Sequence, residues 1–275
     1  MRAAVVQMNS NADKQRNVET AERLVRAAAA DGATLVVLPE KFNLLGTPHD
    51  LLDGAEPLDG PTLAWARELA RELAVDLVAG SIAERREGRE RLSNTSVHIG
   101  PDGRDRGVYR KIHMFDVVVG GREYRESATE APGEEIVSST AGDVELGLTV
   151  CYDLRFPELF RILAVRGARV LTLPAAFTAV TGAAHWDTLV RARAIENQAF
   201  VLAADQVGAH PGGMESFGAS QIVDPWGDVL ARVDGGEGFA AADLDLARQD
   251  EVRSSLPSLA NRVPAAYRWP AEVAR

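Results

Sequence analysis

The sequence predicts a layered α/β fold with mixed sheets, and three observations support that prediction. Short apolar runs such as Leu35–Leu38 have the length and composition of strands that are buried on both faces. The segment 13–30 instead repeats its apolar residues at helical spacing. Turn residues such as Gly100–Gly103 join other apolar runs as hairpins. Strands that alternate with helices in some places and pair as hairpins in others favour layers of mixed sheets.

In the first half of the chain, strand Ala3–Gln7 precedes a helix that Asp13 caps and that ends at Gly32. Pro39 ends the strand Leu35–Leu38, because proline has no N–H to donate to the sheet. The remaining expected elements are a helix from Asp59-Gly60-Pro61 to about Leu73, strand Leu77–Ser81, and the hairpin strands Ser96–Ile99 and Gly107–Arg110.

The second half of the chain continues the same mixture. Its expected elements are strand Leu146–Val150, a helix from about Pro157 to Arg166, strand Val170–Leu173, helix His185–Asn197, strand Phe200–Ala204, the hairpin strands Gln221–Val223 and Val229–Val233, and strand Gly238–Ala241.

The amino-acid composition limits the classes of protein to which this chain can belong. The 275 residues contain no linker, repeat or low-complexity tract, so we expect a single domain over 1–275. A formal net charge of −10 argues against nucleic acid or an anionic membrane as the main partner. Paired cysteines, a P-loop, a dinucleotide-binding glycine motif and metal-ligand spacings are absent from the sequence, so we expect no cofactor and no metal.

Cysteine usage and the N-terminal residues bear on localisation. A single cysteine excludes an internal disulfide and fits a reducing compartment. Residues 1–8 lack the apolar core of a signal peptide, and no run of ~18 apolar residues occurs. We therefore expect a cytoplasmic protein.

That single cysteine, Cys151, directly follows the apolar run Leu146–Val150, and a polar segment separates it from Pro157. The pattern places a nucleophilic side chain at the carboxyl end of a strand, where open α/β sheets hold their sites. A lone cysteine is about as often a small buried hydrophobe, so this window alone leaves both roles open.

Two other expected strands end at charged residues. Of the 30 basic residues only Lys14, Lys41 and Lys111 are lysines, so 27 are arginines. Lys111 follows one strand and offers a compact charge that suits a developing oxyanion. Glu40 follows another strand. Most single lysines and glutamates are solvated surface charges, but a Cys, a Lys and a Glu that met would supply a nucleophile, an electrophile and a base.

Taken together, these windows resemble the nitrilase (carbon–nitrogen hydrolase) superfamily, from Ala3 to about Trp269. The resemblance rests on the motifs Leu38-Pro39-Glu40, Tyr109-Arg110-Lys111-Ile112-His113 and Cys151-Tyr152-Asp153-Leu154-Arg155-Phe156-Pro157-Glu158. The family's catalytic Glu, Lys and Cys fall on Glu40, Lys111 and Cys151. The resemblance implies a four-layer α-β-β-α sandwich of two mixed sheets, which assembles as a homodimer or a larger homo-oligomer.

The family also has a second glutamate after the lysine. Glu126, in Glu126-Ser127 before Pro132-Gly133, matches its setting best, and Glu123 and Glu130 are the alternatives. The backbone N–H of Tyr152 would join Lys111 in holding the oxyanion.

The residues around the nucleophile indicate the branch of the family. Relatives that act on nitriles usually have Trp after the cysteine, so Tyr152 favours an amidase. The runs Ala175–Trp186 and Arg191–Gln198 are similar to the branch that contains ω-amidases and deaminated-glutathione amidases, whereas Asn261–Pro264 departs from the more basic run common there.

The resemblance thus implies hydrolysis of the terminal amide of a small carboxylate-bearing substrate, with release of ammonia through a cysteine thioester. Deaminated glutathione and ω-amides such as α-ketoglutaramate are such substrates. Arg155 is the candidate for binding the remote carboxylate, with a structural ion pair to Glu158 as the alternative, and Phe177 and Thr178 are candidates for lining the same pocket.

Two other functions stay open at this point. One is an N-carbamoyl amino acid or amine amidohydrolase of the same superfamily, and the other is a non-catalytic binding member of the fold. The presence of all four expected catalytic side chains argues against the second.

Overall fold

The computed structural model describes residues 1–267, and two large sheets form its centre. Residue 275, where the expected domain ends, and Trp269, where the resemblance ends, lie outside the described residues. No helix of the described part is long and apolar enough to cross a membrane.

The first sheet has seven strands in the order β17-β1-β2-β3-β5-β4, and β6 pairs with β5 outside this path. Strands β1, β2 and β3 run parallel, while the other pairings are antiparallel. Its strands are β1 (Arg2–Gln7), β2 (Leu35–Val37), β3 (Asp76–Val78), β4 (Ile82–Glu84), β5 (Ser93–Ile99), β6 (Asp105–Arg110) and β17 (Gly238–Asp243).

The second sheet has six strands in the order β16-β15-β12-β11-β10-β9. Its three central strands, β10, β11 and β12, run parallel, and its outer pairings are antiparallel. The strands are β9 (Ser138–Ala141), β10 (Val144–Leu148), β11 (Val170–Ala175), β12 (Phe200–Asp205), β15 (Gln221–Val223) and β16 (Val229–Arg232).

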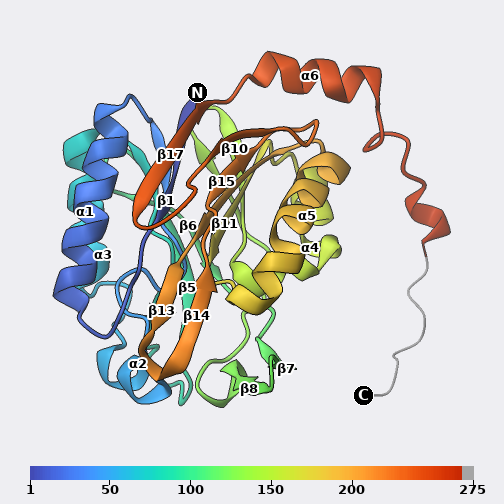
Figure 1. Cartoon of the computed structure of the whole chain (residues 1–275). Coiled ribbons are helices and arrows are strands. Elements are labelled where there is room, and N and C mark those ends of the chain that lie inside the picture. The colour runs from blue at the N-terminus through green and yellow to red at the C-terminus, as the bar shows by residue number, and fades with distance from the viewer. Residues whose placement is uncertain (268–275) are drawn as a thin grey trace.

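The two sheets pack face to face between two layers of helices. Helices α1 (Lys14–Ala30) and α3 (Pro61–Leu73) cover the first sheet, and α4 (Pro157–Val165) and α5 (Ala179–Asn197) cover the second (Figure 1). Alternation along β1 shows the layering, because Val5 packs between the sheets whereas Val6 packs under the helices. The predicted four-layer sandwich with two mixed sheets is confirmed.

One end of the sandwich carries small elements that the apolar pattern did not predict. They lie near one another in Figure 1, and they contribute residues to a common pocket. These elements are α2 (Pro48–Gly54), the hairpin of β7 (Asp116–Val119) and β8 (Arg122–Arg125), and the hairpin of β13 (Val207–His210) and β14 (Met214–Phe217). Helix α6 (Leu246–Ser255) lies near the opposite end (Figure 1).

Several expected boundaries differ from the structure, among them those of α5 and β3. Helix α5 begins at Ala179 rather than His185, because the small residues of its first turns pass close under β14. A Cβ atom on Gly182 would come within 2.3 Å of the Phe217 side chain. Strand β3 ends at Val78 rather than Ser81, because the chain turns at Gly80, whose φ is +42° and which lies directly against the backbone of Pro39.

Candidate active site

Glu40, Lys111, Glu126 and Cys151 all line one pocket of about 230 Å³. Glu40 follows β2, and Lys111 follows β6, both in the first sheet; Cys151 follows β10 in the second. Glu126 begins a short 3-10 turn after β8. The structure therefore brings together four side chains that are far apart in the sequence, and three of them, Glu40, Lys111 and Cys151, follow strands as the sequence predicted.

Cys151 begins a 3-10 turn, Cys151–Arg155, with a backbone φ of +47°. Non-glycine residues seldom adopt this conformation, and it is found at sites where the surrounding structure imposes it. Asp153 imposes it here, because its buried carboxylate accepts hydrogen bonds from the Val150 N–H at 2.8 Å and the Tyr109 hydroxyl at 2.7 Å. The Cys151 thiol is thereby held on a rigid turn, with 8% of the residue exposed.

Both carboxylate oxygens of Glu40 accept hydrogen bonds. Its Oε1 accepts from Asn94 Nδ2 at 2.7 Å and from Lys111 Nζ at 3.1 Å. Its Oε2 accepts from the Ala176 N–H at 2.9 Å, which links the loop after β2 to the loop after β11 in the other sheet. Glu40 is 4% exposed, so these bonds replace the water that a carboxylate ordinarily requires.

Lys111 lies between two carboxylates. Its Nζ donates to Glu40 at 3.1 Å and to both oxygens of Glu126 at 2.8 and 2.9 Å, and the residue is 1% exposed. Burial opposes the charged ammonium, but the attraction of Glu126 and Glu40 outweighs burial and raises the pKa of Lys111 well above its usual value. The lysine is therefore a permanent positive charge at the centre of the pocket.

Glu126, rather than its two alternatives, is the glutamate beside Lys111. Burial alone would raise its pKa, but Lys111 and Lys41 lower the pKa of Glu126 to about 2. Glu123 lies on the β7–β8 hairpin, exposed and paired with Arg125. Glu130 is fully buried and pairs with the Lys41 ammonium at 2.6 Å.

The cluster of Glu40, Glu126, Glu130, Lys41 and Lys111 contains three carboxyl and two ammonium groups. Its charges balance when one carboxyl group is protonated. Burial and the neighbouring Glu126 raise the pKa of Glu130, although Lys41 opposes the rise. We conclude that Glu130 takes up a proton more easily than Glu126, whose pKa is lowered.

The Cys151 thiol is protonated in the resting site. Burial and the nearby Glu40 carboxylate raise its pKa well above the usual value, and Lys111 only partly offsets them. A nucleophilic role for this sulfur would therefore require a base to remove the proton, and Glu40 is the carboxylate whose charge acts on the thiol.

The expected substrate-binding residues line the same pocket. Arg155 forms no ion pair with Glu158 among the described residues; its Nη1 lies 3.2 Å from His185 Nδ1. The Arg155 guanidinium carbon lies over the Phe177 ring, 5.0 Å from its centre. The N–H groups at the edge of this guanidinium have no carboxylate partner among the described residues. Thr178 precedes α5 at the pocket wall, where its hydroxyl lies 2.7 Å from that of Thr181.

Sequence reasoning missed several polar residues that organise this site. Asn94 donates one hydrogen bond to Glu40 and another, at 3.1 Å, to Glu126. Lys41, also missed, forms a buried ion pair with Glu130, which the sequence offered only as an alternative to Glu126. The usable signal was weak: Ser93, Asn94 and Thr95 are polar residues at the start of a strand that is buried along its whole length. Among residues 1–267, no group of three or more His, Cys, Asp or Glu side chains is arranged to hold a metal ion.

Comparison with protein families matches residues 2–254 to the model described as carbon-nitrogen hydrolase. The chain belongs to this family. The deaminated glutathione amidase of Homo sapiens is 43% identical over 272 residues, which cover 96% of this chain and 83% of that protein. The human omega-amidase NIT2 is 38% identical over 257 residues, which cover 93% of this chain and 92% of that protein.

Among solved structures, the NitFhit protein of C. elegans superposes with a TM-score of 0.91 and 36% identity. The match covers 97% of this chain and 66% of NitFhit, so this chain spans about two thirds of that protein. The resemblance drawn from the three motifs is confirmed, and so is the prediction of an amidase, a hydrolase acting on carbon–nitrogen bonds other than peptide bonds.

Proposed function

We propose that the chain hydrolyses an amide bond of a small carboxylate-bearing substrate, either deaminated glutathione or an ω-amide such as α-ketoglutaramate, through a thioester on Cys151. The observation that carries this proposal is the arrangement of Cys151, Glu40, Lys111 and Glu126 around one pocket. The similarity to amidases with these two names supports the substrate class.

In the first step Glu40 accepts the thiol proton while the Cys151 sulfur attacks the amide carbon. The carbon–oxygen double bond becomes a single bond, and its oxygen takes up negative charge. Lys111 and the backbone N–H of Tyr152 hold that oxygen. Because Lys111 is charged before the substrate arrives, no charge has to be moved to stabilise the oxyanion.

In the second step the carbon–nitrogen bond breaks, and Glu40 returns its proton to the departing nitrogen. A water molecule then attacks the thioester, with Glu40 again accepting a proton, and the sulfur leaves with that proton as the free thiol. Glu126 stays charged throughout and keeps Lys111 directed at the reacting oxygen.

Arg155 supplies the charge that binds the remote carboxylate of the substrate. Its guanidinium group lines the pocket, has no carboxylate partner among the described residues and is oriented by stacking on Phe177. An arginine in this setting can grip a carboxylate with two parallel hydrogen bonds.

The test is product release by the purified protein on a panel of substrates. The panel contains deaminated glutathione, α-ketoglutaramate, succinamate, an N-carbamoyl amino acid and a simple nitrile. The amide bonds of deaminated glutathione are secondary, so its hydrolysis releases an amine rather than the ammonia expected from the resemblance, and has to be followed as cysteinylglycine. The primary ω-amides release ammonia.

We expect turnover of the first two compounds, with Cys151→Ala as the inactive but folded control. Turnover of the carbamoyl compound or the nitrile alone would refute the proposed substrate class. Unchanged turnover by Cys151→Ala would refute the thioester mechanism.

We further propose that the chain acts as one domain in a cytoplasmic homodimer. Exposed apolar side chains on α4 and α5, namely Ile162, Val165 and Ile195, support association through the helical layer. Light scattering on the purified protein tests the dimer, and a monomeric mass would contradict it.

A further inference from the structure

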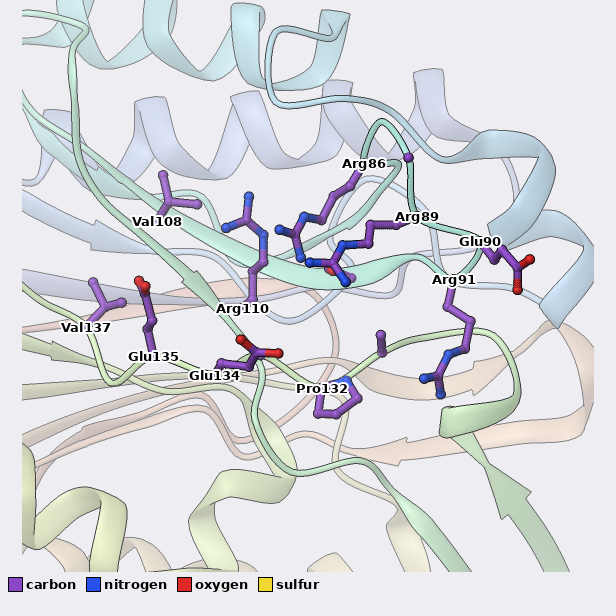
Figure 2. Close-up of a pocket in the computed structure, with 14 residues that line it drawn as sticks. Arg86, Arg89, Glu90, Arg91, Val108, Arg110, Pro132, Glu134, Glu135 and Val137 are labelled. Carbon is purple, nitrogen blue, oxygen red and sulfur yellow. The ribbon is translucent and has the colours of Figure 1, made fainter.

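A second cavity, of about 420 Å³, lies on the other side of the end of β6 (Figure 2). The loop between β4 and β5 forms one wall, and the segment that leads into β9 forms the other. We call it the arginine cleft, and it is lined by Arg86, Gly88, Arg89, Glu90, Arg91, Ser93, Val108, Arg110, Ala131, Pro132, Gly133, Glu134, Glu135 and Val137. It shares no residue with the catalytic pocket, and its volume is in the range of small-molecule sites.

Two of the four arginines in the arginine cleft have no partner among residues 1–267. Arg110 forms two hydrogen bonds to the buried Glu84, at 2.7 and 2.8 Å, and Arg91 donates to the Ser127 carbonyl at 3.1 Å. Within the described residues, neither the Arg86 nor the Arg89 guanidinium group forms an ion pair or a side-chain hydrogen bond.

Figure 2 shows the Arg86 and Arg89 side chains extending toward Arg110 across the arginine cleft. Guanidinium groups that converge repel one another, and an anion placed among them relieves that repulsion. In a chain whose formal net charge is −10, Arg86 and Arg89 create a local positive field, because no acidic residue among residues 1–267 pairs with them. The geometry therefore favours an anion at this end of the cleft.

The other wall of the arginine cleft sets a second requirement. Glu134 and Glu135 are exposed side chains that line it, next to the apolar Val108 and Val137. Carboxylates repel a ligand that is negative throughout, but they accept hydrogen bonds from hydroxyl or amino groups. A ligand that satisfies both walls has its negative charge at one end and hydrogen-bond donors at the other.

We propose that the arginine cleft binds a phosphorylated small molecule, with its phosphate or diphosphate group on Arg86 and Arg89 and its hydroxyl groups toward Glu134 and Glu135. Arginine suits this role because its planar fork makes paired hydrogen bonds to phosphate oxygens. The site is separate from amide hydrolysis, because no lining residue belongs to the catalytic pocket.

Isothermal titration calorimetry with inorganic pyrophosphate and with ADP tests the proposal. The test variant is Arg86→Gln/Arg89→Gln, which leaves the Arg110–Glu84 pair intact. The matched control is Arg104→Gln/Arg248→Gln, which removes the same number of charges from exposed side chains elsewhere. Thermal unfolding and amide hydrolysis are measured alongside, to show that both variants fold.

We expect both probes to bind the parent protein and the control with equal affinity, and ADP to bind more tightly than pyrophosphate. The test variant should bind both at least tenfold more weakly, because charge-assisted hydrogen bonds are lost. Absence of binding to the parent protein, or an equal loss of affinity in the control, would overturn the site. Equal affinity for the two probes would overturn the role assigned to Glu134 and Glu135.

Discussion

Arg110 and Lys111 are consecutive residues, yet they face two different cavities. In one cavity the positive charge is paired with carboxylates, and in the other part of the positive charge has no carboxylate partner among the described residues. Lys111, on the catalytic side, is buried and flanked by Glu40 and Glu126. On the other side Arg110 lies at the rim of the arginine cleft, where Arg86 and Arg89 have no partner within the described residues. Because neighbouring residues of a strand point to opposite faces, one strand end serves both cavities.

The difference follows from the cost of burial. An ammonium that is removed from water must be paired, whereas a guanidinium at an open cleft can stay solvated until a ligand arrives. The two buried lysines follow the first rule, because Lys41 pairs with Glu130 and Lys111 with two glutamates. Lys14, whose side chain is 30% exposed, also pairs with a carboxylate, that of Glu56. In this arginine-rich chain, lysine occurs only beside carboxylates that are largely buried.

The largest effect should come from exchanging the cation on the catalytic side. Lys111→Arg puts a wide planar group where a compact ammonium fits between Glu40 and Glu126, so the oxyanion loses its donor. We expect kcat to fall on the order of 10²–10³-fold. The neighbouring change Arg110→Lys is the matched control. It should leave kcat within about threefold, because a cation still pairs with Glu84. The loss of one hydrogen bond should lower the stability of the protein only modestly.

Steady-state kinetics on the best amide of the panel, with thermal unfolding to confirm folding, measures this pair. Equal losses in kcat for the two variants would show that the two faces of the strand end are not functionally distinct.

The layers of the fold could be predicted because their strands are apolar runs. Leu35–Leu38 and Phe200–Ala204 are buried along their whole length and read as strands without any tertiary information. The hairpins β7–β8 and β13–β14 could not be predicted, because they are short and partly exposed, and contacts with other segments hold them in place.

The same distinction applies to the candidate site. Residues placed directly after buried strands, such as Glu40 and Cys151, could be named from the sequence. Asn94 and Lys41 could not, and Glu130 could be named only as an alternative to Glu126, because nothing in their local sequence separates a buried polar side chain from a solvated one. Their positions follow from the pairing of β4 with β5 and from the path of the chain after β8.

A smaller effect, on stability, should arise from the low pKa of Glu126. Its folded-state pKa of about 2 lies below the ordinary value of 4.5, so its contribution to stability is present above pH 4.5 and is lost as the pH falls toward 2. A shift of this size corresponds to a contribution on the order of 3 kcal/mol. Glu126→Gln should therefore be less stable than the parent protein at pH 6, and the two should converge near pH 2.

Urea unfolding of both proteins between pH 2 and pH 6 measures that convergence. A difference in the free energy of unfolding that stays constant over this range would show that Glu126 is not ionised against Lys111 in the folded protein.

The smallest effect we predict is at the mouth of the catalytic pocket, where Arg155 resembles the unpaired arginines of the arginine cleft more than it resembles Lys111. Arg155→Lys keeps the charge but removes the paired hydrogen bonds, so KM for an acidic amide should rise about tenfold while kcat changes little. Arg104→Lys, on an exposed turn, is the control. A neutral amide of similar size should show no rise in KM with either variant. If KM for the acidic amide is unchanged, Arg155 does not bind the substrate carboxylate, and its stacking on Phe177 serves only to close the pocket wall.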